Sequence, residues 1–264
     1  MLGVAFATSV SGFLGERFGW QAMFYLLTVL YAVTALLLYL ELRGNPQTRA
    51  QHADATPLAA AFRRMAGLTR LPWVRVILAT VFIEGALFYG ALAFVALYVH
   101  QRFGLGLGAS GSVAAMFAAG GLLFAAAAGR LLPRFGEIGL VMGGGGLMTL
   151  GFLGLAAAPA PGWAVPCVVA LGAGIYMMHN TLQVHATQMA PATRGAALAI
   201  FACSLFTGQS AGVWLASQTV DAAGARPVFV AAAIGLLLLA LDFRRRLKQR
   251  GTYGGPSAHP TMRA

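Results

Sequence analysis

The sequence predicts an all-α, multi-pass transmembrane helical bundle, and three observations support this fold class. Hydrophobic residues make up 59% of the 264 residues and charged residues only 9%, whereas soluble domains carry about 25% charged residues. Long stretches contain no Asp, Glu, Lys or Arg, and each has at least the ~20 residues that one membrane-spanning helix needs. These runs are residues 18–40, 103–129, 138–193 and 195–220. With shorter apolar segments at both ends, we expect about eight spans.

Two of the expected helices precede a long polar segment. They occupy residues 2–15 and 18–40, and the first has neither the basic region nor the cleavage site of a signal peptide. Residues 43–72 are rich in Arg and also contain an Asn-Pro pair, Gln and His, a composition that predicts a loop. We assign residues 1–42 to the remnant of an N-terminal half and 43–72 to a central cytoplasmic loop.

Six further helices are expected in a unit that covers residues 73–243. The first of them is Trp73–Val99. The longest charge-free run must contain two helices, because Ala-Pro-Ala-Pro-Gly at 158–162 has the composition of a turn. The last helix, Pro227–Leu241, precedes a basic tail at residues 244–264.

The positions of the basic residues predict the topology. When eight spans alternate across the membrane, every Lys and Arg except Arg17, Arg102 and Arg226 falls on one side. The positive-inside rule makes that side cytoplasmic. We therefore expect a protein of the cell membrane with both ends of its chain on the cytoplasmic side. The formal net charge of +11 therefore indicates topology and contact with the lipid bilayer. A nucleic-acid partner is not expected, because the basic residues do not gather on one soluble domain.

A carboxylate lies in the middle of the predicted span Trp73–Val99. Glu84 is ~17 Å from the Trp73 end of an α-helix, close to the centre of a hydrocarbon core ~30 Å thick. Acidic groups inside a membrane face the bundle interior or a water-filled cavity, because a charge in lipid is costly. Two interpretations follow: Glu84 binds a proton or solute, or it stays protonated and only hydrogen-bonds a neighbouring helix.

A polar stripe in a later span is the second candidate site. It comprises Tyr176, His179, Asn180, Gln183 and Thr187. Their spacing places them along one helical face, which we expect to contact protein or a cavity rather than lipid. Interhelical hydrogen bonding is the alternative, and we favour it for Thr187. His179 is the expected titratable partner of Glu84, and a Glu/His pair can carry a proton.

The next span carries a third polar group and a pattern of small residues. The polar group comprises Ser204, Thr207, Gln209 and Ser210. Its hydroxyls can bond backbone carbonyls one turn back, whereas Gln209 is a candidate for solute or proton binding. The small residues Gly208 and Gly212, like Ala86 and Gly90, have the spacing of closely packed membrane helices.

No enzymatic or metal-binding pattern is found. His179 and His185 are six residues apart, which is not the i, i+4 spacing of a helical zinc pair, and a G-x-S-x-G motif is absent. Cys167 and Cys203 lie in different predicted spans and indicate neither a thiolate site nor a disulfide framework. We expect no enzymatic activity, no cofactor and no metal.

Three segments resemble the major facilitator superfamily. Residues 129–136 (GRLLPRFG) resemble the G-x-L-a-D-R-x-G loop of that family in its second-half copy. Residues 11–20 resemble the end of the fifth span and its following turn. Residues 191–195 and 206–212 are similar to the loop before the eleventh span and to that span. The positions that match the loop motif are Gly129, Arg130, Arg134 and Gly136.

The resemblance implies a transporter with two six-helix halves, alternating access and a central site at mid-membrane depth. By that comparison the chain holds spans five to twelve, so we expect four spans before Met1. Two departures are that Pro133 replaces the loop aspartate and that Ala7-Thr8 replaces the Gly-Pro pair of the antiporter motif. We expect secondary transport of a small organic solute, coupled to protons and directed outward. The alternative is a truncated, non-transporting membrane protein or interaction partner.

Overall fold

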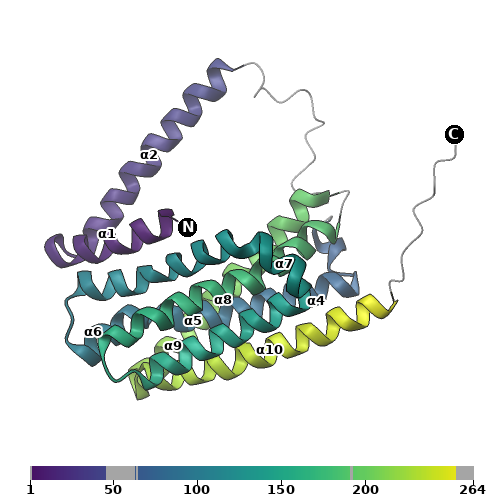
Figure 1. Ribbon diagram of the computed structural model, residues 1–264. Helices are drawn as coiled ribbons and strands as arrows, with labels where there is room; N and C mark the ends of the chain where they lie inside the picture. The colour runs from purple at the N-terminus through teal and green to yellow at the C-terminus, as the bar shows by residue number, and fades with distance from the viewer. Residues whose placement is uncertain (1, 46–62, 64, 191–192, 254–264) are drawn as a thin grey trace.

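The computed structural model describes residues 2–45, 63, 65–190 and 193–253, and within these ranges the chain is almost entirely helical, without strands. Figure 1 shows long helices that run side by side in one bundle. Most of the predicted central loop and residues 254–264 of the predicted tail lie outside the described residues. Because the described residues form long apolar helices, the all-α, multi-pass fold class predicted from composition is confirmed.

The first two helices are α1 (Leu2–Phe18) and α2 (Gln21–Gly44). The α1 helix packs against the start of a later helix, where the carboxylate of Glu16 accepts a hydrogen bond of 3.0 Å from the backbone N–H of Gly108. In contrast, α2 has no buried residue and leaves the bundle at an angle (Figure 1). Beyond its first turns, which are partly covered, the surface of α2 is thus open to contact with surroundings other than this bundle.

The predicted span Trp73–Val99 is present, but it is divided into four segments. They are α4 (Pro72–Glu84), η2 (Gly85–Tyr89), α5 (Gly90–Leu92) and α6 (Val95–Phe103). Pro72 begins α4 at a position where its missing N–H has no helical partner to lose. The η2 segment is a π-helix, so the regular α-helical hydrogen bonding changes directly after Glu84.

The next two predicted spans are joined in the 51-residue helix α7 (Leu107–Ala157). The helix is broken at Gly136, whose backbone angles are φ 62° and ψ −177°. A side chain would strain this conformation, whereas glycine adopts it readily. Residues 129–135, predicted as a loop, are instead helical up to this one-residue break. The α7 helix therefore supplies two rods of the bundle.

The last three helices agree with the expected order. They are α8 (Pro161–Gln188), α9 (Arg194–Ala223) and α10 (Ala225–Tyr253). The predicted turn at 158–162 is confirmed, while α10 continues well beyond the predicted Leu241. Six helices among the described residues are long and apolar enough to span a membrane. The break in α7 adds one rod to these six helices, and the 17-residue α1 adds another. About eight rods are therefore present, as expected.

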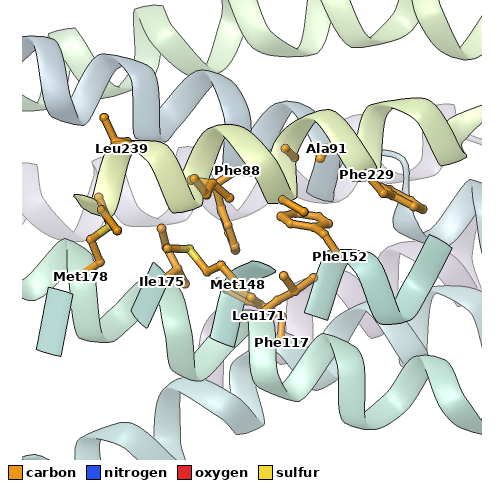
Figure 2. Close-up of a cluster of buried hydrophobic side chains, with 14 of the residues drawn as sticks. Phe88, Ala91, Phe117, Met148, Phe152, Leu171, Ile175, Met178, Phe229 and Leu239 are labelled. Atoms are coloured by element: carbon orange, nitrogen blue, oxygen red, sulfur yellow. The ribbon is translucent and has the colours of Figure 1, made fainter. Parts of the chain in front are cut away.

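Aromatic side chains from different rods meet in the centre of the bundle. Figure 2 shows Phe88 of η2 near Phe117 and Phe152, which come from the two halves of α7. The ring centroids lie 5.8 Å from Phe88 in both cases, and Phe229 of α10 stacks 5.9 Å from Phe152. These separations are typical of favourable aromatic pairs. The cluster ties η2, α7 and α10 into one core.

Glycines allow the backbones of η2 and α9 to touch. A Cβ atom added at Gly212 would overlap the carbonyl oxygen of Ala86, and one added at Gly90 would lie 2.8 Å from the carbonyl carbon of Gly212. The two small-residue patterns predicted from the sequence therefore face each other, as is common between membrane helices. The contact fixes the position of α9 beside the segment that follows Glu84.

Replacing Gly212 with Ala is expected to destabilise the bundle, because the new methyl group would meet a backbone oxygen that cannot move aside easily. Overpacking typically costs ~1–3 kcal/mol, so the melting temperature of the purified protein, followed by tryptophan fluorescence in detergent, should fall. Gly146→Ala is the matched control, since its added Cβ would meet no atom of another helix within 4 Å. Equal melting temperatures for the two variants would contradict this explanation.

Candidate functional site

Glu84 and His179 form a buried pair between α4 and α8. The distance from Glu84 Oε2 to His179 Nδ1 is 2.7 Å, so the contact predicted from the sequence is observed. The Glu84 side chain is fully buried, whereas 16% of the His179 side chain is exposed. The second carboxylate oxygen, Oε1, is buried and receives no hydrogen bond from the described residues. Burial of an unpaired acceptor is costly, so this oxygen marks a position where a donor from a ligand or water would be favourable.

The backbone around Glu84 is irregular in a way that sequence periodicity does not reveal. The π-helical segment η2 begins at the next residue, Gly85, and short π-helical turns often occur at functional sites. A Cβ atom added at Gly85 would lie 2.6 Å from the carbonyl oxygen of Leu205 and 3.2 Å from the backbone nitrogen of Gln209. The candidate residue Gln209, which is half-buried, therefore lies beside the segment that follows Glu84.

The predicted polar stripe on α8 is divided between two environments. Tyr176 packs against Phe117 with ring centroids 5.7 Å apart. His179 turns to Glu84 and also packs 5.6 Å from the ring of Phe201. The stripe therefore does not act as one surface: its first two residues join the packed interior.

The other three residues of the stripe line a cavity of about 770 Å³ between α7, α8 and α9. The cavity is lined by Phe124, Ala128, Gly129, Leu132, Pro133, Glu137, Leu140, Asn180, Thr181, Gln183, Val184, Thr187 and Leu198. Its volume is in the usual range for small-molecule sites. Asn180 and Gln183 supply amide donors and acceptors. The hydroxyl of Thr187 donates to the carbonyl of Val184 in its own helix at 2.7 Å, so the interhelical hydrogen bond expected for Thr187 is not the one it makes.

The residues that match the family loop lie at one end of this cavity. Gly129 contributes to the lining, together with Pro133. Arg130 and Arg134 are exposed and are not part of the lining, and the guanidinium of Arg134 lies over the ring of Phe135 at 5.5 Å. The loop therefore shapes the cavity through uncharged residues, which include Leu132, rather than through its charges.

The hydroxyl groups of α9 act mainly in structure. Thr207 and Ser210 donate to backbone carbonyls one turn back, at 2.7 and 2.9 Å, as the sequence predicted. Ser204 differs, because its hydroxyl donates to the carbonyl of Leu78 on α4 at 2.8 Å. This bond adds a polar connection between α9 and α4 near the glycine contact.

A second histidine site was missed by the sequence analysis. His185 Nε2 lies 3.1 Å from Glu137 Oε2, and His185 Nδ1 lies 3.3 Å from Arg250 Nη1. Because an arginine only donates, Nδ1 must accept and Nε2–H must donate to Glu137. The guanidinium of Arg250 also lies 4.4 Å from the ring centre of Trp73. We call Trp73, Glu137, His185 and Arg250 the basic-side cluster.

The basic-side cluster joins α4, α7, α8 and α10. The signal available in the sequence was the common location of its members near the basic-side ends of the predicted spans. Spacing along the chain could not show that they touch. No group of three or more metal-ligating side chains is found in the described part of the chain, and both cysteines there are free thiols.

Comparison with protein families matches residues 1–194 to the Major Facilitator Superfamily. The matched region includes Glu84, the polar stripe of α8 and the residues of the loop motif. Gln209 and Arg250 lie beyond it. No curated protein gives a match to the chain.

Replacing Arg250 with Gln is expected to loosen the C-terminal end of α10, because both its contact with Trp73 and its hydrogen bond to His185 would be lost. Exposed cation–π contacts are worth ~0.5–1 kcal/mol, so backbone amides of residues 244–253 should exchange with deuterium about two- to fivefold faster. Arg245→Gln, at a neighbouring exposed position, is the control. Equal exchange in both variants would show that the basic-side cluster does not hold this segment.

Proposed function

Because this chain belongs to the major facilitator superfamily, a family of secondary transporters, we propose that it moves a small organic solute out of the cell in exchange for protons. The observation that carries this proposal is the buried Glu84–His179 pair, whose histidine lies on the same helix, α8, as the polar residues of the cavity. One helix thus links a titratable pair to a space that fits a solute.

The pair has the geometry that proton binding needs. At 2.7 Å a proton can be shared between the carboxylate and the imidazole without any movement of the helices. His179 is the partly exposed member and Glu84 the enclosed one, so His179 is suited to exchange protons with water. Oε1 of Glu84 is buried and receives no hydrogen bond from the described residues, so one acceptor of the pair is left for a water or solute group.

The cavity supports a solute that is partly apolar. Phe124, Leu132 and Leu140 provide apolar walls, while Asn180 and Gln183 provide directional hydrogen bonds. Sites with this composition hold small organic molecules and orient them through a few polar groups. Asn180 directly follows His179, so a change at the pair can alter the position of a cavity residue.

The location of the cavity supports outward transport. The junction between the two rods of α7 contains Gly129, Pro133 and Glu137. This junction lies on the side of the bundle that is rich in Arg and Lys. The positive-inside rule assigns that side to the cytoplasm. A solute that enters from the cytoplasm would therefore find the cavity first, and we propose that this is the loading position of an exporter in the cell membrane, with the C-terminus also inside.

Replacing Glu84 with Gln is expected to abolish proton movement driven by solute, because an amide cannot release the proton. The protein should be reconstituted into liposomes that contain the pH-sensitive dye pyranine, and a panel of organic cations, anions and neutral amphiphiles should be added. We expect at least one compound to change the internal pH with the native chain and none with Glu84→Gln. Asp221→Asn, on the exposed surface, controls for loss of a carboxylate. Full activity of Glu84→Gln would contradict the proposal.

Replacing Gln183 with Ala is expected to weaken solute binding while proton release stays possible, because the Glu84–His179 contact does not involve Gln183. For a compound identified in the same assay, KM should rise by about five- to twentyfold, as for loss of one or two hydrogen bonds, with little change in kcat. Gln188→Ala, on the same helix but outside the cavity lining, should leave KM unchanged. If both variants behave alike, the cavity is not the solute site.

A further inference from the structure

A second groove lies on the outer face of the bundle, between α4 and α10. Its volume is about 420 Å³ and its lining consists of Pro72, Arg75, Val76, Ala79, Thr80, Ile83, Leu239, Asp242 and Arg246. It shares no lining residue with the cavity between α7, α8 and α9. The groove therefore requires an explanation separate from solute transport.

Charged and apolar residues occupy opposite ends of the groove on both helices. On α4, Arg75 lies at one end and Ile83 lies eight residues further along, which is ~12 Å at 1.5 Å per residue. On α10, Leu239 lies seven residues before Arg246, toward the other end of the groove. Both arginines are thus at the basic-side end, and both aliphatic side chains are deeper in the predicted membrane.

The charged end is arranged to receive an anion. The Nε atom of Arg246 donates to Asp242 at 2.6 Å, which orients the guanidinium and leaves its other N–H groups available. Arg75 is exposed and lies in the first turn of α4, whose unpaired N–H groups and helix dipole also favour negative charge. With one aspartate against two arginines, the charge of this end remains positive.

We propose that this groove binds one anionic phospholipid, with its phosphate group at Arg75 and Arg246 and an acyl chain along Ala79, Ile83 and Leu239. A phospholipid combines an anionic group at the membrane surface with an apolar chain below it, which matches both ends of the groove. Basic pockets between membrane helices on the cytoplasmic side are known to suit such headgroups. A soluble anion would satisfy only the arginines and leave the apolar half of the groove unused.

The test uses the full chain in nanodiscs of phosphatidylcholine with a minor fraction of phosphatidylglycerol. After transfer to detergent, native mass spectrometry counts the lipids of each kind that remain bound. We expect one phosphatidylglycerol to be retained in preference to phosphatidylcholine. Arg75→Gln and Arg246→Gln should each reduce that preference about fivefold, the value expected for one basic residue near an anionic surface.

Two further variants separate a specific groove from general attraction. Arg245→Gln removes a neighbouring exposed charge outside the groove and should leave retention unchanged. Ala79→Trp changes no charge but fills the apolar end at an exposed position, and it should also displace the lipid. Equal loss with Arg245→Gln, full retention with Ala79→Trp, or equal retention of both lipids would each overturn the proposal. The exposed side chain of Arg75 makes no hydrogen bond or ion pair with the other described residues, so its variant remains informative if Arg246→Gln unfolds.

Discussion

The close approach of helix backbones at glycines is the constraint on which the other features of this structure depend. In lipid, apolar burial gives little reason for helices to associate, so contact area and short-range packing must hold them together. Gly208 and Gly212 let α9 lie directly against Phe82 and Ala86. On the other side of the bundle, Gly120 and Gly172 let α7 approach α8 in the same way. The contacts of Gly208 and Gly212 hold α9 against the residues on either side of Glu84.

Two histidines give α8 two different connections. His179 meets the buried Glu84, and His185 belongs to the basic-side cluster, where Arg250 fixes which nitrogen accepts. Six residues separate them, ~9 Å along the helix, and Asn180 and Gln183 lie in that interval on the cavity. A movement of α8 would change the pair, the cavity and the cluster together. This arrangement is suited to coupling, because no separate element has to carry the change from one site to another.

The polar groups on the outer surface of the bundle are also placed as a lipid environment requires. The exposed residues Thr207 and Ser210 donate their hydroxyl hydrogen bonds to the helix backbone, which satisfies these two donors without water. Arginines gather near the basic-side ends, where their long side chains can reach the headgroups. The groove between α4 and α10 combines both tendencies, since its aliphatic and cationic parts follow the depth of the membrane.

The sequence alone determined the fold class and the approximate number and order of the helices, because composition and run length report directly on the solvent in which a helix lies. It also predicted His179 as the partner of Glu84, and it contained the two small-residue patterns, whose contact with each other only the structure shows. The tertiary structure decided the rest. The π-helical turn after Glu84, the division of the α8 stripe between core and cavity, and the meeting of His185 with Glu137 and Arg250 all depend on how helices rotate and slide against one another. Helical periodicity states which residues share a face, but only packing between distant segments states what that face touches.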